Sequence, residues 1–356
     1  MSIIENFRKQ FFKKYNNCAA LVLSHSNRLY LSGFSSSDGV VLITPNSSYL
    51  IVDFRYFEMA KNKSNTFVPI LADRSLLAVA KELLDKEKIK SIIIEDDYVT
   101  LSLSRRIKEV FNDCEIASFE GFLNELRSVK TEDEIKRIQN AQNLTDATFS
   151  HLLEILSPSM TENEVACELD FFMRRNGAEE CAFKTIAVSG KKSSLPHGEP
   201  SDILLTKNSF LTLDFGAKLD GYCSDMTRTV VIGKADEEMK RVYDIVLSAQ
   251  LSAINAVHEN VIGCDVDYAA RKIIADNGFG NCFGHSTGHG VGIDVHEAPS
   301  FSPNYKKEIK KNSVLSVEPG IYIEGKFGVR IEDLVVVGDK GAVNLTKSTK
   351  NLIEIG

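Results

Sequence analysis

Two aspartates in the second half of the chain follow the pattern of a β-hairpin. Asp214 and Asp225 lie in apolar segments on either side of a polar turn at residues 218–221. If Ala217 pairs with Tyr222, the two aspartates face each other with their Cβ atoms ~5 Å apart. Such like charges repel unless a divalent cation lies between them. The pair therefore suggests a metal site, and the alternative is a different register with one aspartate near the end of a strand.

A second acidic pair is arranged in the same way. Glu318 and Glu332 flank a turn signal around Gly325, and a hairpin centred there places the two glutamates opposite each other. Arg330 would then lie two residues away on the same face as Glu332. Because two such pairs are harder to attribute to chance than one, the four carboxylates together predict a metal site.

Three of the seven histidines lie in one glycine-rich stretch, residues 285–297. His285, His289 and His296 have helical spacing, but the four glycines in and beside this stretch disfavour a helix. We therefore predict a loop or strand that brings imidazoles close to a ligand. The histidines at other positions that we interpret as ordinary structural residues are His25, His151 and His258.

Four carboxylates with one imidazole form an oxygen-rich ligand set. Such a set suits hard or borderline divalent ions, Mn²⁺ first, with Co²⁺ and Zn²⁺ as alternatives. Four negative charges would overcompensate a single divalent ion, so we expect two ions.

Apolar patterning predicts that two domains position these residues. Residues 1–125 alternate short apolar segments with helical ones, which indicates a compact α/β domain. In residues 126–356 helices and strands come in runs, which indicates an α+β domain with a largely antiparallel sheet. Thr131 with its acidic first turn predicts the N-cap of a long helix that runs towards Leu156. The strands expected in the two domains are 19–24, 40–43, 49–52, 67–71 and 91–95, then 184–189, 210–215, 224–232, 314–317 and 330–337.

Five local motifs in chain order resemble the ligand signature of the pita-bread metallopeptidases. They are Asp214, Asp225 in YCSDMTRT, His289 in STGHGVGIDVHE, Glu318 in SVEPGIY and Glu332 in VRIED. This group includes prolidase, aminopeptidase P and methionine aminopeptidase. The resemblance implies a pita-bread catalytic domain over residues 126–356. The preceding residues 1–125 are similar to the smaller creatinase-like N-terminal domain of prolidases and aminopeptidases P.

The resemblance also implies a division of labour among the residues. Asp214 would hold one ion, His289 and Glu318 the other, and Asp225 and Glu332 would bridge both. Glu318 would serve as general base and then acid for a water that attacks the scissile carbonyl. The residues implied to contact substrate or stabilise the oxyanion are His197, His285 and His296, whereas Arg330 would orient Glu332 or the substrate. A homodimer is implied by the family alone.

One departure from the family pattern bears on substrate choice. Prolidases commonly carry an arginine shortly after the VHE-x-P element, where it binds the free carboxylate of a dipeptide, and here Ser300 follows VHEAP. We therefore expect an Xaa-Pro aminopeptidase, with an Xaa-Pro dipeptidase as the alternative. A binding protein that uses the same fold without catalysis is a further alternative, which the presence of all five ligands disfavours.

Composition excludes several other classes of protein. The 356-residue chain has a formal net charge of −7, without the basic excess of a nucleic-acid or anionic-membrane binder. No apolar run approaches the ~18 residues that span a bilayer, and the N-terminal stretch lacks the apolar region of a secretory signal. We therefore expect a soluble, cytoplasmic enzyme with a peptide as its partner. Seven scattered cysteines predict reduced, mostly buried side chains and no disulfide or thiolate zinc site.

Overall fold

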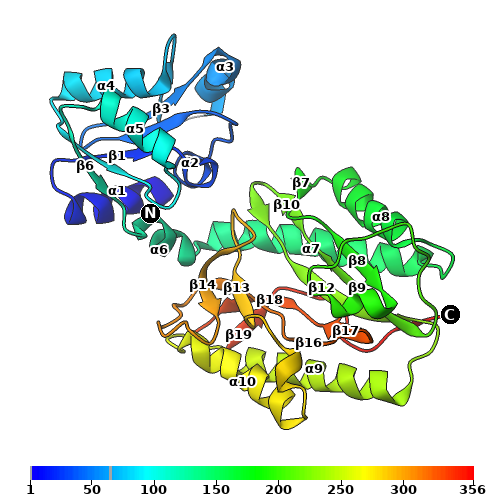
Figure 1. Cartoon of the computed structure of the whole chain (residues 1–356). Coiled ribbons are helices and arrows are strands. Elements are labelled where there is room, and N and C mark those ends of the chain that lie inside the picture. The colour runs from blue at the N-terminus through cyan, green and yellow to red at the C-terminus, as the bar shows by residue number, and fades with distance from the viewer. Residues whose placement is uncertain (1, 64–65) are drawn as a thin grey trace. The chain divides into compact units, whose positions relative to one another are not determined.

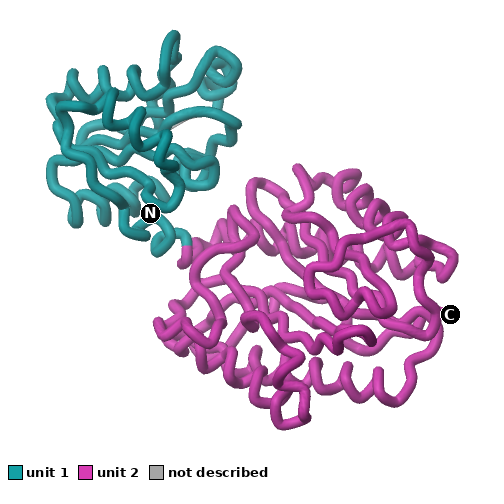
Figure 2. Tube along the Cα trace, viewed as in Figure 1, with its two compact units in different colours: residues 1–127 teal, residues 128–356 magenta. Residues whose placement is uncertain are grey.

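The computed structural model describes residues 2–63 and 66–356. The chain divides into two compact units, residues 1–127 and 128–356, which Figure 2 shows in different colours. The predicted domain boundary near residue 125 falls within α6 (Phe122–Ser128), the last helix before the second unit.

Unit 1 is built on a six-stranded sheet in the order β4-β3-β2-β1-β5-β6. Only β2 runs antiparallel to its neighbours β1 and β3, and the other pairs are parallel. The strands are β1 (Ala19–Val22), β2 (Val40–Ile43), β3 (Ser48–Val52), β4 (Val68–Leu71), β5 (Ser91–Ile94) and β6 (Glu115–Ser118). All five predicted strands of this unit are therefore present.

Five helices accompany that sheet: α1 (Ile3–Lys14), α2 (His25–Ser32), α3 (Phe54–Lys63), α4 (Leu76–Glu87) and α5 (Leu101–Val110). The sequence also has helical patterns at residues 75–85 and 102–111, and these correspond to α4 and α5. Sequence patterning missed α2, which has only 8 residues and is too short to show a clear helical period, and it missed α3 as well.

Unit 2 begins with the long helix that the sequence predicts. Helix α7 (Glu132–Ile155) starts at the predicted N-cap, because Thr131 accepts a hydrogen bond from the Glu134 amide while the Glu134 side chain accepts one from the Thr131 amide. The other helices are α8 (Glu162–Arg175), α9 (Glu237–Ala256) and α10 (Gly263–Asp276), with short 3₁₀ segments η1 (Gly190–Ser194) and η2 (Gly280–Cys282).

The strands of unit 2 form small, mostly antiparallel sheets, as predicted. Two of them carry the site: β20-β12-β9-β8 and β14-β13-β15-β18-β19, accompanied by the hairpin β16-β17 and the ribbon β11-β10-β7. The strands are β7 (Glu180–Cys181), β8 (Ile186–Ser189), β9 (Ser209–Phe215), β10 (Ala217–Leu219), β11 (Tyr222–Cys223), β12 (Met226–Ile232), β13 (Gly288–Gly290), β14 (Glu297–Phe301), β15 (Val314–Val317), β16 (Gly320–Ile323), β17 (Phe327–Arg330), β18 (Asp333–Val337), β19 (Ala342–Asn344) and β20 (Glu354–Ile355).

Side chains alternate between the two faces of each strand, and this alternation places the polar residues of both sheets on the faces that point away from the two apolar cores. On β9, Leu211, Leu213 and Phe215 pack in the same core cluster as α7 and α8, so Asp214 must point to the opposite face. Likewise, Leu315 on β15 belongs to the cluster of α9 and α10. Figure 1 shows these two helix pairs on opposite sides of the strands. The polar faces therefore meet between the two cores.

The register predicted for the first hairpin was wrong by two residues. Asp214 pairs with Thr227 instead of Asp225, and Leu219 pairs with Tyr222. The loop has only two residues, Asp220 and Gly221, whose φ angles of 50° and 77° both lie in the left-handed region. Asp-Gly is favoured in such two-residue turns, whereas we had assumed a four-residue loop. A shift of two leaves both aspartates on one face, so the candidate site survives the correction.

The register predicted for the second hairpin is confirmed. Gly320 pairs with Arg330, and Val317 pairs with Asp333. Glu318 and Glu332 lie between these two ladders, where neither amide bonds across the hairpin: the Glu318 amide donates to Thr287 and the Glu332 amide to Thr227. The two glutamates therefore face each other where the backbone hydrogen bonds between these strands are interrupted.

The seven cysteines are free, as predicted, but the expectation that most are buried was wrong. Only Cys223 is buried, whereas Cys167 is exposed and the others are partly exposed. Within the described residues, no helix is both long and apolar enough to cross a membrane.

Candidate metal centre

All nine residues predicted to form the site line one pocket of unit 2, with a volume of about 490 Å³. They are Asp214, Asp225, His289, Glu318, Glu332, His197, His285, His296 and Arg330. Ser300 lines the same pocket. His25, His151 and His258 are not among its lining residues.

Three of the predicted metal ligands form a tight cluster. Asp225, His289 and Glu332 each offer a donor atom, and these atoms lie within 4.8 Å of one another. They come from three separate segments: the residue before β12, strand β13 and the gap between β17 and β18. Glu318 adjoins the cluster, with its Oε1 atom 3.2 Å from Nε2 of His289.

His289 and Glu318 form an ion pair. Burial lowers the pKa of His289, but the hydrogen bond and charge of Glu318 outweigh it and raise that pKa to about 9. Burial raises the pKa of Glu318, yet its pairing with His289 prevails and lowers that pKa to about 2. Ser316 orders the pair, because its hydroxyl accepts from the His289 amide and donates to Glu318.

The surroundings of the other three carboxyl groups disfavour their charged form and raise their pKa values. Burial and the charges of Glu332 and Asp214 raise the pKa of Asp225 well above its ordinary value. Burial, followed by the charges of Glu318 and Asp214, does the same for Glu332. Burial raises the pKa of Asp214 as well, although Arg330 opposes this. A bound cation would relieve this repulsion.

Unpaired oxygens at the same place favour a cation over protons alone. Within the described part of the chain, Asp214 Oδ1 and Glu332 Oε1 are buried side-chain atoms without a hydrogen-bond partner. Buried acceptors are almost always paired, so two orphans beside the Asp225–His289–Glu332 cluster require an explanation. The donor set of carboxylates and one imidazole fits a divalent ion.

Arg330, which the resemblance predicts to orient Glu332 or the substrate, makes its direct contact with Asp214. Its guanidinium donates to Asp214 Oδ2 at 2.6 Å and reaches Glu332 only through Thr227, whose hydroxyl accepts from Arg330 Nε and donates to Glu332 Oε2. Arg330 also donates to the Tyr322 hydroxyl at 2.7 Å. Arg330 thus fixes Asp214 directly and Glu332 through Thr227.

The remaining histidines surround the ligands from different segments. The ring of His296 lies 4.2 Å, centroid to centroid, from that of His289. Burial and the charge of His289 lower the pKa of His296, and burial lowers that of His285. The His285 ring is fixed by its Nε2 contact with the Tyr322 hydroxyl at 2.9 Å. Lower pKa values keep both rings neutral near pH 7, so each carries one N–H. In His285 this N–H is on Nδ1 and donates to the Ser286 carbonyl at 2.8 Å.

Sequence patterning did not assign roles to Tyr322 and Thr227, which link the site together. The Tyr322 hydroxyl lies between Arg330 and His285, and burial raises its pKa to about 12. Strand alternation after Asp225 places Thr227 on the same face and could have revealed it. Nothing in the sequence brings Tyr322 to His285, because that contact joins strand β16 to the loop that precedes β13.

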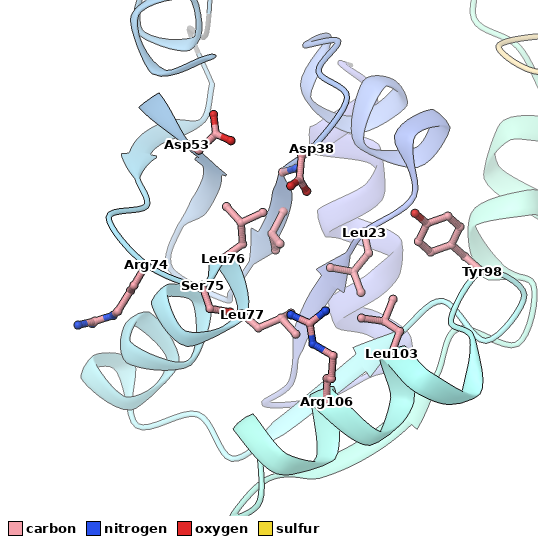
Figure 3. Close-up of a pocket in the computed structure, with 12 residues that line it drawn as sticks. Leu23, Asp38, Asp53, Arg74, Ser75, Leu76, Leu77, Tyr98, Leu103 and Arg106 are labelled. Carbon is pink, nitrogen blue, oxygen red and sulfur yellow. The ribbon is translucent and has the colours of Figure 1, made fainter. Parts of the chain in front are cut away.

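Unit 1 contains a pocket of about 390 Å³ of a different character (Figure 3). Two of its charged residues are paired elsewhere: Asp53 pairs with Arg55 at 2.6 Å, and Arg74 pairs with Glu82 and points away from the pocket. The described residues that line it include no histidine. The metal ligands therefore gather in unit 2.

Comparison with known families supports this assignment. Residues 136–339 match the model of metallopeptidase family M24, and residues 4–129 match the creatinase/prolidase N-terminal domain. The chain belongs to metallopeptidase family M24. It is therefore an enzyme that uses divalent metal, and its predicted pita-bread fold with a creatinase-like N-terminal domain is confirmed.

Similar proteins carry two different activities in their names. An Xaa-Pro dipeptidase from Bacillus anthracis matches with a TM-score of 0.94 at 37% identity, covering 99% of each chain. An X-Pro aminopeptidase from Thermotoga maritima matches with a TM-score of 0.92 at 37% identity, covering 97% of this chain and 100% of that one. An uncharacterized peptidase of Bacillus subtilis is 38% identical over 94% of each chain.

Proposed function

We propose that the protein is an Xaa-Pro aminopeptidase that uses two divalent ions, preferably Mn²⁺. The proposed ligands are Asp214, Asp225, His289, Glu318 and Glu332. Similar proteins are named both Xaa-Pro dipeptidase and X-Pro aminopeptidase. The choice between these two activities must therefore be argued from the pocket of this chain.

The observation that carries the proposal is the residue at position 300. Ser300 lies on β14 directly opposite His289 on β13 and lines the pocket. A cation here would stand beside the metal ligands, where it could bind the carboxylate of a dipeptide. Arg330 offers no substitute, because Asp214, Tyr322 and Thr227 already occupy its donors.

The side chains around the pocket suit peptide hydrolysis. When bound, the ions would polarise the scissile carbonyl and lower the pKa of the attacking water. Glu318 would take up the proton of that water and pass it to the leaving proline nitrogen. His296 and His197 would offer N–H donors to the developing oxyanion. His285, whose Nδ1 donates to the Ser286 carbonyl at 2.8 Å, would instead act through the Tyr322 hydroxyl at its Nε2.

The test compares two substrates of the wild-type enzyme and of Ser300→Arg. With Mn²⁺ added, we expect the wild type to cleave an Xaa-Pro-Xaa tripeptide with a higher kcat/KM than an Xaa-Pro dipeptide. Ser300→Arg should shift that ratio towards the dipeptide by about tenfold to a hundredfold, the value of a charge-assisted contact of roughly 1.5–3 kcal/mol. A wild type that prefers the dipeptide would contradict the proposal.

An Xaa-Pro dipeptidase is the second candidate, and Lys184 favours it. Lys184 lines the pocket, and its ammonium pairs with Glu199 at 2.8 Å in a position where both side chains are over 70% exposed. An exposed ion pair is weak, so a substrate carboxylate could replace Glu199. If this candidate is right, Lys184→Met should lower kcat/KM for the dipeptide far more than for the tripeptide, while Lys191→Met serves as a control outside the pocket.

A further inference from the structure

We propose that Lys130 is a positioning residue that holds the loop carrying His296 over the metal ligands. The proposal rests on the proposed function, because it gives His296 a part in peptide hydrolysis. Residues 291–296 join β13 to β14, so this loop sets where the His296 ring lies relative to His289.

The loop is closed around a single carboxylate, that of Glu297. Glu297 Oε1 accepts a hydrogen bond from the Asp294 amide at 2.9 Å. A Cβ atom at Gly292 would lie only 2.6 Å from Glu297 Oε2, so the carboxylate packs directly against the loop backbone. The Cys223 amide, which donates to the Gly292 carbonyl at 2.7 Å, ties the same loop to the strand that leads to Asp225.

Lys130 supplies the positive charge for this carboxylate. Its Nζ atom lies 3.4 Å from Glu297 Oε2, and the two side chains are only 1% and 6% exposed. Buried charges are retained only when paired, and removal of one partner leaves the other without compensation. The pair therefore fixes the carboxylate, and the carboxylate fixes the loop.

Lys130 can act as an anchor because its own backbone is fixed on both sides. Its amide donates to the Asn312 carbonyl at 3.0 Å, and the next residue, Thr131, is the N-cap of α7. An unbroken series of contacts thus runs from the start of α7 through Glu297 to His296.

A kinetic double-mutant cycle tests whether Lys130 acts through His296. We expect Lys130→Met to lower kcat for the tripeptide by about 10- to 100-fold, as a misplaced catalytic group does, with bound metal retained. Lys130→Arg should restore most of the activity. In the His296→Ala background, Lys130→Met should cause little further loss, whereas independent, additive losses would overturn the proposal. Lys136→Met, an exposed lysine on α7, is the matched control and should match the wild type.

Two further measurements keep the test decisive if Lys130→Met folds poorly. The double variant Lys130→Met/Glu297→Gln removes both buried charges and should fold, yet it should stay slow; a return to wild-type kcat would overturn the proposal. Hydrogen exchange of residues 291–297 should also increase in this variant while that of α9 does not. If the wild type cleaves no Xaa-Pro peptide, the proposed function fails, but unchanged exchange in this loop is what would refute the role of Lys130.

Discussion

Neighbouring histidines in this pocket have contrasting environments. His289 contacts Glu318 and Asp225, at 3.2 and 3.6 Å from its Nε2 atom, and so stands among carboxylates. His296 is exposed enough to meet a substrate, and its ring lies against that of His289. At this scale, a ligand and a substrate-facing donor can be told apart by what each ring touches.

Alanine substitutions should separate these two roles. His289→Ala should lose bound metal and activity together, because one member of the tight donor cluster is gone. His296→Ala should keep its metal while kcat falls by a factor on the order of 10²–10³, the usual cost of an oxyanion donor. Elemental analysis beside steady-state kinetics decides the question, and loss of metal from His296→Ala would place that residue among the ligands instead.

At the scale of elements, strand β13 owes its position to a glycine. A Cβ atom on Gly288 would lie 1.9 Å from the Ser316 carbonyl oxygen, so only glycine lets β13 and β15 approach this closely. Because His289 is the next residue, this close approach also sets the position of a proposed metal ligand.

Gly288→Ala should therefore lower both stability and metal affinity. We expect a loss of about 1–3 kcal/mol in the free energy of unfolding, typical of overpacking, together with weaker Mn²⁺ binding. Gly284→Ala is the control, since a Cβ there meets no atom within 4 Å. Denaturant unfolding and metal titration measure both effects. If Gly288→Ala and Gly284→Ala have the same unfolding free energy and the same Mn²⁺ affinity, the close approach of β13 to β15 does not set the position of His289.

The two hairpins show how far the sequence predicts such elements. The strands around Gly325 have matching apolar patterns on both sides of the turn, so the Glu318–Glu332 register could be predicted. At Asp220-Gly221 the same arithmetic failed, because the length of the turn was misjudged. The contact of Arg330 with Asp214 lay beyond prediction, since it joins separate hairpins whose relative placement depends on packing against two different helix pairs.

For the molecule as a whole, the buried site should govern how stability depends on pH. Asp225 and Glu332 have raised pKa values, so the folded, metal-free chain binds their protons more tightly than the unfolded chain does. His289 acts in the same direction: its stabilisation is complete below its unfolded pKa of about 6.5 and is lost as the pH rises through about 9. The lowered pKa values of His285 and His296 act in the opposite direction, but only as the pH approaches and passes below their unfolded value of about 6.5. The lowered pKa of Glu318 matters only below about pH 4.5.

We therefore expect the melting temperature of the metal-free protein to rise as the pH is lowered from about 9 to about 6.5. Calorimetry across this range measures it, and His289→Ala should show a smaller dependence. A melting temperature that falls on acidification within this window would contradict the charges assigned to the site. The homodimer and the cytoplasmic location stay predictions from the sequence.

The binding of two ions by five ligands is the central claim, and titration of the metal-free protein with Mn²⁺ tests it most directly. We predict two bound ions per chain, with cleavage of an Xaa-Pro-Xaa tripeptide appearing as they bind. Glu332→Ala, which lacks a proposed bridge between the ions, should bind fewer and remain inactive. A stoichiometry of one in the wild type, or of two in Glu332→Ala, would contradict the account.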